Sequence, residues 1–291
     1  MTTENNGQPD QRRARAIGST TVYLQRPDPI PDPFVYVDHD GLVGRLVQVL
    51  RDGGEHDLPL SVCLVGPPGV GKTAAVWAAV KALQTVCYTT QGSTDCSAQE
   101  LVVFPVPADM TRFDAVASGL CTAALDGGIA LFDEIGKVAR YCPEALSPLA
   151  SMLDDRRVLW SDFLKMPFPV ARGFAFVCTA QIDEPLPEYI TQRMVTFEVT
   201  PPSPEAMLHI MEAKAPHAPG GLMAAFRDWA SQRVGLSPRE GSLVIHYAHR
   251  LARQLGPSDP PAHVYRHVVA EAVKVVMGRR PAPAPVRERW P

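Results

Sequence analysis

Residues 60–73 read Leu-Ser-Val-Cys-Leu-Val-Gly-Pro-Pro-Gly-Val-Gly-Lys-Thr. The apolar run before Gly66 predicts a buried strand, and the Ala-rich run after Thr73 predicts a helix. The turn between them fits the pattern G-x-x-x-x-G-K-[S/T], with Gly66 first and residues 71–73 last. A strand, a glycine-rich turn and a helix in this order are typical of a loop that binds the phosphates of a nucleoside triphosphate.

The residue types in this turn have separate chemical tasks. Glycines allow backbone N–H groups to close around phosphates, and the helix N-terminus adds the positive end of its dipole. Lys72 is expected to reach the β- and γ-phosphates, and the Thr73 hydroxyl to bind Mg²⁺. The expected nucleotide-binding residues of the turn are Gly66, Pro67, Pro68, Gly69, Val70, Gly71, Lys72, Thr73 and Ala74.

Length and composition limit the class of protein. The chain has 291 residues, enough for one large domain and one small domain. Its formal net charge of −3 argues against broad attraction to nucleic acid or to anionic membranes. No apolar run reaches the ~18 residues that span a bilayer, and the polar residues 1–11 do not resemble a signal peptide. The six cysteines show no C-x-x-C pairing, so we expect reduced thiols in a cytoplasmic protein.

The order of predicted elements indicates two domains. Strands that alternate with helices predict an α/β domain over residues 34–201, with a parallel five-stranded sheet between layers of helices. A proline-rich junction at residues 200–204 precedes four predicted helices, so residues 202–277 are expected to form a helical lid. Residues 1–33 lack apolar periodicity and predict a flexible arm, and residues 278–291 predict a proline-rich tail.

Three further stretches allow specific expectations. Residues 12–15, Arg-Arg-Ala-Arg, are interpreted as part of a solvated arm, with a phosphate contact as the alternative. Residues 91–110 predict a polar excursion, and the Ala-rich residues 113–125 predict a helix. Residues 158–160 and 168–170 predict the arms of a hairpin.

The predicted hairpin carries two aromatic residues, Trp160 and Phe163. Both could face a substrate in a central pore, or both could pack in the core of the hairpin. The sequence leaves the two alternatives open, with the core favoured.

A pair of acids, Asp133 and Glu134, ends the apolar run of residues 127–135. Ligands bind at the C-terminal ends of strands in an open α/β sheet, which is where this pair is expected. Because neighbouring residues on a strand point to opposite faces, the two acids should have separate tasks. We expect Asp133 to hold the Mg²⁺ shell through water and Glu134 to orient or deprotonate an attacking water. The alternative for such a pair is a simple helix start.

Three motifs together resemble the core of an AAA+ ATPase. They are Gly-Pro-Pro-Gly-Val-Gly-Lys-Thr at residues 66–73, Leu-Phe-Asp-Glu-Ile at residues 131–135, and a strand that ends in Thr-Ala-Gln at residues 179–181. Residues 186–194, Leu-Pro-Glu-Tyr-Ile-Thr-Gln-Arg-Met, resemble a segment of the MoxR branch of that superfamily.

Two shorter stretches extend the resemblance, which covers about residues 36–277. Residues 236–240, Leu-Ser-Pro-Arg-Glu, resemble the sensor-two segment of the MoxR branch, and residues 43–45 resemble the stretch that commonly lines the adenine pocket. The resemblance therefore implies that Val43 and Gly44 contact the adenine of ATP.

The same resemblance implies roles for two arginines and an amide. Arg193 would be an arginine finger that reaches the γ-phosphate of a neighbouring subunit, and Arg239 would contact the γ-phosphate within its own subunit. A surface salt bridge is the alternative for each arginine. Gln181 stands at the sensor-one position, where Asn is usual, and Gln192 stands where the family often has Asp.

The resemblance also implies a cofactor set and partners. Members of this branch use ATP and Mg²⁺, form rings that are typically hexamers, and remodel a partner protein that is frequently a von Willebrand factor A-type protein. Two other functions stay open: a nucleic-acid motor or loader built on the same core, and a scaffold that binds ATP and hydrolyses it slowly. The change from Asn to Gln at position 181 motivates the scaffold.

Overall fold

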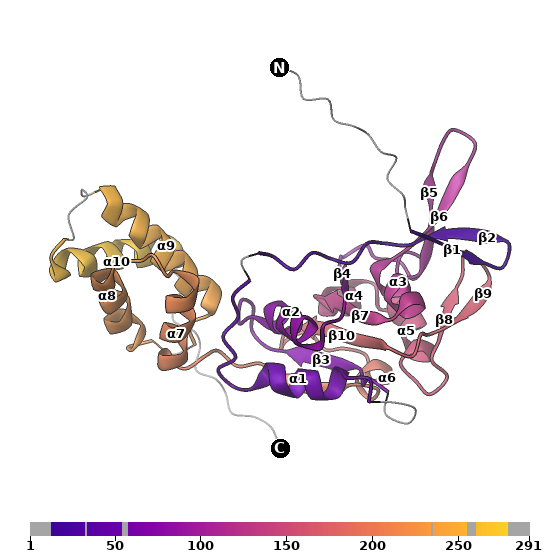
Figure 1. Cartoon of the computed structure of the whole chain (residues 1–291), viewed down its shortest axis with the longest axis horizontal. Coiled ribbons are helices and arrows are strands. Elements are labelled where there is room, and N and C mark those ends of the chain that lie inside the picture. Colours follow the sequence, from indigo (N-terminus) through magenta and orange to yellow (C-terminus); the bar gives the residue numbers. More distant parts are fainter. Residues whose placement is uncertain (1–12, 33, 54–57, 234, 255–259, 279–291) are drawn as a thin grey trace. The chain divides into compact units, whose positions relative to one another are not determined.

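The computed structural model describes residues 13–32, 34–53, 58–233, 235–254 and 260–278. The chain divides into two compact units (Figure 1). The first extends to residue 67 and resumes over residues 72–200, whereas the second joins residues 68–71 to the chain from residue 201 onward. Within the described residues, no helix is both long and apolar enough to cross a membrane.

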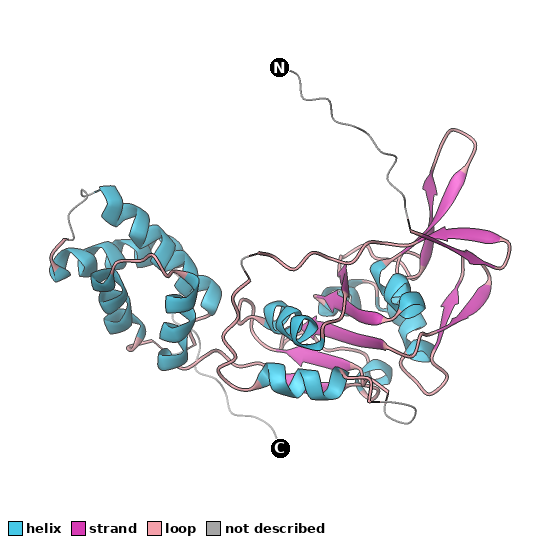
Figure 2. Cartoon of the chain, in the orientation of Figure 1, coloured by secondary structure: helices cyan, strands magenta, loops and turns pink. Residues whose placement is uncertain are grey.

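The centre of the first unit is a five-stranded parallel sheet (Figure 2). Its order is β11-β3-β10-β7-β4, and its strands are β3 (Val62–Val65), β4 (Cys87–Gln91), β7 (Gly128–Asp133), β10 (Phe174–Ala180) and β11 (Val195–Glu198). Every residue of β10 is buried, because helices cover both faces of a parallel sheet and its central strands therefore have no polar side. The predicted α/β fold is confirmed.

Helices pack on this sheet in two groups. Helix α2 (Lys72–Leu83) contacts β7 and β10 and packs on α1 (Leu42–Leu50). Helices α3 (Gly119–Asp126), α4 (Ile135–Tyr141) and α5 (Ser147–Met152) share a core with alternate residues of β7 and β10. The remaining short helices are a 3-10 turn (Pro143–Leu146) and α6 (Glu188–Thr191).

A second sheet corrects two expectations. It has the order β1-β2-β6-β5, with strands β1 (Ala14–Ile17), β2 (Thr20–Tyr23), β5 (Val103–Pro107) and β6 (Phe113–Ala117). The expected flexible arm is therefore wrong for β1 and β2, and the helix expected from residue 113 begins only after the N-cap Ser118. Strand β6 pairs on both sides, so its tertiary contacts override the helix propensity of its alanines.

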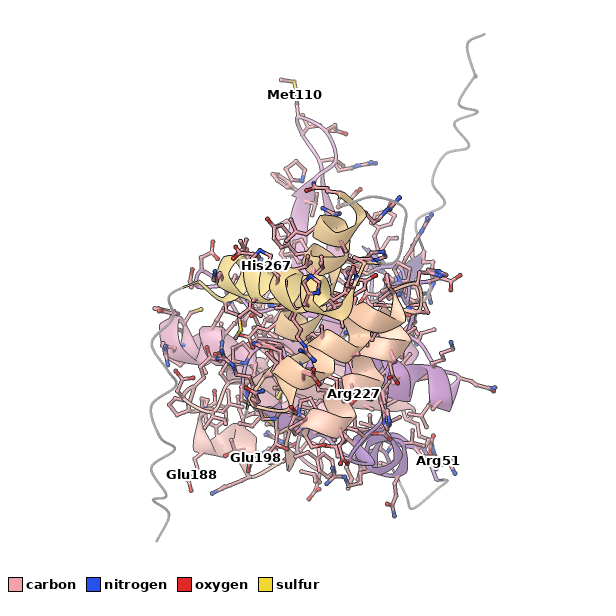
Figure 3. The ribbon with its side chains drawn as sticks, turned by 90° about the vertical axis from the view of Figure 1, so that its left-hand side faces the viewer. Arg51, Met110, Glu188, Glu198, Arg227 and His267 are labelled. Atoms are coloured by element: carbon pink, nitrogen blue, oxygen red, sulfur yellow. The ribbon has the colours of Figure 1, made fainter. Side chains whose placement is uncertain are left out.

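The β5–β6 hairpin is built for an outer position. Strand β5 lies at the edge of its sheet, where the missing N–H groups of Pro105 and Pro107 are tolerated. Met110 lies fully exposed at the outer end of this hairpin (Figure 3). The polar excursion expected over residues 91–110 thus contains a strand.

Two arginines attach β1 to the end of α3. Arg13 donates to the Tyr88 hydroxyl at 3.2 Å and forms an ion pair with Asp126. Arg15 donates to the carbonyl of Leu125 at 2.6 Å, where the helix C-terminus favours a cation. The interpretation of these arginines as part of a solvated arm is therefore wrong, while Arg12 lies outside the described residues.

Residues 24–32, which we call the strap, run along the outer edge of β4. The Asp28 N–H donates to the Cys87 carbonyl at 2.8 Å, and the Asp28 carboxylate accepts from the Thr89 N–H at 2.5 Å. The Gln25 N–H donates to the Thr122 hydroxyl at 3.1 Å. The strap thus occupies backbone groups that an open edge strand would offer to another chain.

The hairpin predicted around residue 160 is present. It consists of β8 (Val158–Ser161) and β9 (Met166–Pro169), which pair in antiparallel fashion. Leu159 and Phe168 form its buried side, whereas Trp160 is 44% exposed and Phe163 is 36% exposed. The two aromatics are therefore not the core of the hairpin, and their contact with a substrate stays a prediction.

The second unit is helical over its described residues from 201 onward. It contains α7 (Pro204–Lys214), α8 (Gly220–Ala230), α9 (Pro238–Gln254) and α10 (Ala262–Met277). Helix α10 packs on α8 and α9, and α7 packs on α9. Phe226, Val244 and Tyr265 lie in the apolar interior that these contacts bury.

The bond between Asp28 in the strap and Thr89 in β4 can be tested by mutation. Asp28→Ala removes the acceptor of the Thr89 N–H, so we expect the free energy of unfolding in urea to fall by about 1–2 kcal/mol. Asp32→Ala, an exposed change in the same strap, is the matched control and should stay within about 0.5 kcal/mol of the parent. Equal losses in the two variants would contradict a specific role for the Asp28 carboxylate.

Candidate functional site

The loop between β3 and α2 has the glycines that its path requires. A Cβ at Gly66 would collide with the carbonyl oxygen of Val199, so only glycine fits there. Gly69 and Gly71 have φ values of 80° and 104°, a left-handed backbone that other residues rarely adopt. The predicted loop is therefore formed, with the backbone of residues 66–71 in place ahead of the first turn of α2.

Lys72, the first residue of α2, reaches back across the loop. Its Nζ donates to the carbonyls of Gly66 at 2.6 Å and Pro67 at 2.9 Å. Partial burial lowers the pKa of Lys72, while Asp133, Glu184 and Glu134 oppose that shift by favouring the charged form. The ammonium group thus lies at the loop, bonded to two backbone carbonyls, and three carboxylates favour its charged form.

The predicted metal ligands lie together. The Thr73 hydroxyl lies 3.1 Å from both carboxylate oxygens of Asp133. The buried Thr179 hydroxyl donates to the Asp133 carboxylate at 2.5 Å and accepts from the Glu134 N–H at 2.9 Å. A hydroxyl beside a carboxylate is the hard oxygen donor set that Mg²⁺ prefers, so these residues fit that ion.

The expectation that Asp133 and Glu134 are neighbours on one strand is wrong. Strand β7 ends at Asp133, and Glu134 has a left-handed backbone with φ 58° ahead of α4. The two acids therefore diverge because the chain turns between them, not because they alternate on a strand. A non-glycine residue in this conformation carries backbone strain of order 1–3 kcal/mol.

The Glu134 carboxylate has two partners that sequence reasoning missed. Gln91 Nε2 donates to it at 2.9 Å, and the Lys137 ammonium forms an ion pair with it. Gln91 ends β4 opposite Asp133 of β7, a register that a single sequence does not reveal. Lys137 lies three residues after Glu134, a spacing that would have indicated the pair on a helix.

Gln181 follows β10 at the same edge of the sheet. Its N–H donates to the Glu184 carboxylate at 3.1 Å. A Cβ at Gly136 would collide with Glu184, so the glycine lets this carboxylate approach α4. Glu184 is a further acidic neighbour of Lys72 that the sequence patterns did not single out.

The structure places Arg193 at the N-terminal ends of the parallel strands, opposite to the C-terminal ends where Asp133 and Gln181 lie. Arg193 precedes β11, and the Val195 N–H donates to the carbonyl of Ser61 at 2.8 Å, at the start of β3. The phosphate-binding loop instead follows the end of β3. Arg193 is therefore separated from the loop of its own chain by the length of a strand.

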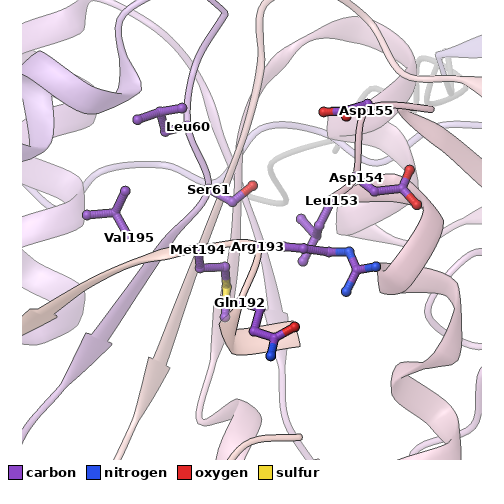
Figure 4. A pocket seen from close by; sticks show the side chains of 9 residues that line it. All are labelled: Leu60, Ser61, Leu153, Asp154, Asp155, Gln192, Arg193, Met194 and Val195. Carbon is purple, nitrogen blue, oxygen red and sulfur yellow. The ribbon is translucent and has the colours of Figure 1, made fainter. Parts of the chain in front are cut away.

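Arg193 lines a cavity of about 560 Å³ at this N-terminal end of the strands (Figure 4). Asp154, Asp155 and Gln192 line it together with Arg193. Hydrogen bonds from Arg156 hold the pKa of Asp154 below its usual range, and the Arg193 charge adds to that shift. The Arg193 guanidinium also donates to the Tyr189 carbonyl.

Arg239 lies in the first turn of α9. Ser237 and Glu240 form a reciprocal cap there, in which the Ser237 hydroxyl donates to the Glu240 carboxylate at 2.8 Å. Within the second unit, a Cβ at Gly69 would lie 3.1 Å from the Arg239 Cβ. The tip of the loop therefore packs against the residue that the resemblance assigned to the γ-phosphate.

The two residues expected at the adenine lie at the start of α1. The Val43 N–H donates to the Asp38 carboxylate at 3.2 Å, and Gly44 is exposed in the same first turn of α1. No described contact tests their role, so the adenine contact stays a prediction.

The Thr179 hydroxyl permits a direct test of the site. Thr179→Val keeps the shape but leaves the Glu134 N–H without its acceptor and removes one of the two hydroxyl donors to Asp133. We expect the free energy of unfolding to fall by about 1–3 kcal/mol, and the Mg²⁺-dependent affinity for a fluorescent ATP analogue to fall as well. Thr179→Ser keeps the hydroxyl and should restore most of both quantities. A fully stable valine variant with unchanged affinity would contradict this role for Thr179.

The sequence of the α/β unit is similar to that of a known domain family and of known proteins. Residues 61–184 match the family model of the AAA domain (dynein-related subfamily). The mitochondrial Lon protease homolog of Bos taurus is 28% identical over 148 residues, which are 48% of this chain and 15% of that protein. The Lon protease of Aster yellows witches'-broom phytoplasma (strain AYWB) is 30% identical over 148 residues, 48% of this chain and 18% of that protein. The chain therefore spans less than a fifth of the length of these two relatives.

Solved structures of Thermotoga maritima RuvB share the fold. A point mutant of that protein aligns with a TM-score of 0.59 at 16% identity, covering 82% of this chain and 70% of that one. The structure described as the RuvB Holliday junction branch migration motor aligns with a TM-score of 0.56 at 15% identity, covering 82% and 70%. At such identity the likeness concerns the fold alone. Residues 61–184 of the α/β unit are thus similar to the AAA domain, 48% of the chain is similar to part of the Lon proteases, and the α/β fold is shared with RuvB.

Proposed function

We propose that this chain hydrolyses ATP at the subunit interfaces of a ring, in the manner of the MoxR-like branch, and uses the cycle to remodel or activate a partner protein. The arrangement of Asp133 carries the proposal, because its carboxylate joins the Thr73 hydroxyl to the Thr179 hydroxyl beside Glu134. This arrangement sets a metal-binding carboxylate and a candidate base side by side at the phosphate-binding loop.

The loop residues supply binding and charge. Backbone N–H groups of residues 69–74 surround the phosphates, and Lys72 exchanges its bonds to Gly66 and Pro67 for the β- and γ-phosphates. Thr73 and Asp133 hold Mg²⁺, which neutralises charge on the phosphate oxygens. Val43 and Gly44 contact the adenine, and Arg239 contacts the γ-phosphate from the helical lid.

Glu134 orients or deprotonates the attacking water, with Gln181 placing that water from the neighbouring strand. In the structure, the Glu134 carboxylate is occupied by Gln91 and Lys137. A base must exchange such partners for the water before it can act, so basal turnover should be low. This contact also favours the second candidate, a scaffold that binds ATP and hydrolyses it slowly.

Arg193 acts on a neighbouring subunit. It lies at the edge of the sheet opposite to its own loop, which supports a role in trans. A guanidinium supplied in trans stabilises charge on the transferring phosphoryl oxygens and raises turnover by ~10³–10⁵ in comparable enzymes. A ring, typically a hexamer, gives every loop a neighbour that supplies this arginine.

Mixing two inactive variants tests the shared site. Glu134→Gln and Arg193→Ala should each lower ATP turnover by ~10² or more when alone. In a random mixture, about one quarter of the interfaces join an intact Glu134 to an intact Arg193, so part of the phosphate release should return. The measurement is phosphate release by each variant and by the mixture.

Arg172→Ala is the control for loss of an exposed arginine, because Arg172 pairs only weakly with Asp52 at 3.6 Å. It should keep parental turnover. A mixture that stays as inactive as its components would overturn the role of Arg193 in trans.

Capture from the native cell tests the partner. Glu134→Gln in ATP should bind nucleotide without turning over, so a client stays bound and mass spectrometry can identify it. A protein that apyrase releases supports remodelling, and a von Willebrand factor A-type protein would fit the MoxR branch. Retention that nuclease abolishes would instead favour the nucleic-acid motor or loader.

A further inference from the structure

Three sulfur atoms from separate segments of the first unit lie together on one face of its parallel sheet. Cys63 in β3 is the register partner of Cys178 in β10. The Cys178 Sγ donates to the Met194 Sδ at 3.8 Å, and Met194 directly precedes β11. We call these three residues the sulfur cluster. None of the functions proposed above uses them.

The two thiols of the sulfur cluster lie side by side, because register partners on neighbouring strands point to the same face of a sheet. A hydrogen bond with Cys178 lowers the pKa of the Cys63 thiol, burial opposes this shift, and the positive charge of Lys72 adds to it. A thiol with a lowered pKa forms the thiolate more readily, and the thiolate is the form that binds metal ions.

The spacing of the sulfur atoms fits a metal ion. Metal–sulfur bonds are about 2.3 Å long, so two sulfur atoms on one trigonal ion lie about 4 Å apart. The 3.8 Å between the Cys178 Sγ and the Met194 Sδ is close to that separation. An ion would therefore take the place of the thiol protons between the sulfur atoms, with little movement of the side chains.

The ligand types select the ion. Among the described residues, no group of three or more His, Cys, Asp or Glu side chains could hold a metal ion, so the two thiols lack the further ligands that zinc requires. The third group here is the thioether of Met194. Thiolates and thioethers are soft ligands that select Cu(I), whereas Mg²⁺ and Ca²⁺ require oxygen ligands.

Met194 supplies a route to the buried thiols. Cys63 and Cys178 are 1% and 0% exposed, so an ion cannot reach them directly from solvent. Met194 lines the cavity at Arg193 (Figure 4), and its Sδ also contacts the Cys178 Sγ. The thioether can therefore take an ion from the cavity and pass it to the thiols.

We propose that the sulfur cluster binds one Cu(I) ion through the thiolates of Cys63 and Cys178 and the thioether of Met194. Binding releases the two thiol protons to solvent and changes no oxidation state. Cu(I) with two thiolates carries one negative charge, and the positive charge of Lys72, which acts on Cys63, offsets it. The proposal requires neither ATP turnover nor a ring.

Anaerobic titration of the reduced full chain with Cu(I), with bicinchoninate as a coloured competitor, measures the affinity. One ion should bind per chain ahead of any other, and X-ray absorption of that complex should show three sulfur ligands at about 2.3 Å. Each thiol proton that binding releases lowers the Kd about tenfold per pH unit, so two protons give about a hundredfold. A first ion with only nitrogen or oxygen ligands, or no such ion, would overturn the proposal.

Variants locate the ion. Met194→Leu keeps the volume but removes the thioether, so it should fold like the parent and raise the Kd for Cu(I) by ~10-fold or more. Met152→Leu changes a buried methionine of α5 and is its matched control, with an unchanged Kd. Cys178→Ala should raise the Kd further and halve its dependence on pH, whereas Cys121→Ala, at an equally buried cysteine of α3, should change neither.

Met194→Leu decides the question even where Cys178→Ala lowers the Tm, because leucine fills nearly the same space as methionine. A Kd that neither variant changes would overturn the proposal. An increase in Kd that Cys121→Ala matches would overturn it as well, because the ion would then bind thiols without regard to their place in the fold.

Discussion

The Asp133 carboxylate is the contact on which the rest of the site depends. It accepts from Thr73 at the start of α2 and from Thr179 on β10, and thereby connects three segments that lie far apart in sequence. Thr179 in turn accepts from the Glu134 N–H, which helps to hold the left-handed turn after β7. Because one hydroxyl serves both acids, the proposed metal ligand Asp133 and the proposed base Glu134 cannot shift independently.

The direction of the parallel sheet imposes a second constraint. All five strands point the same way. Loops that follow strands therefore lie at the C-terminal ends of the strands, and loops that precede strands lie at the N-terminal ends. The phosphate-binding loop, Glu134 and Gln181 belong to the first group, and Arg193 belongs to the second. A single chain with this sheet holds the proposed base and the proposed arginine finger too far apart to meet on one nucleotide.

The sequence predicted those elements that are determined by residues close together in the chain. The phosphate-binding loop, the buried strands and the helices of the second unit each depend on spacing within a short window. Strand β6 escaped prediction because its pairing with β2 and β5 overrides its alanines. The hairpin of β1 and β2 escaped because β2 joins the sheet through β6, about ninety residues later. Gln91 and Glu184 escaped for the same reason, since register and close packing bring them to the site.

The strap has a consequence for synthesis on the ribosome. Its segment is synthesised before its partners, because Gln25 bonds to a residue 97 positions later and Arg13, just before β1, pairs with one 113 positions later. At ~5–20 residues per second, the strap must wait several seconds before its partners emerge. During that interval the strap lacks the partners that it has in the folded chain, whereas β4 can be covered by the strap as soon as it emerges.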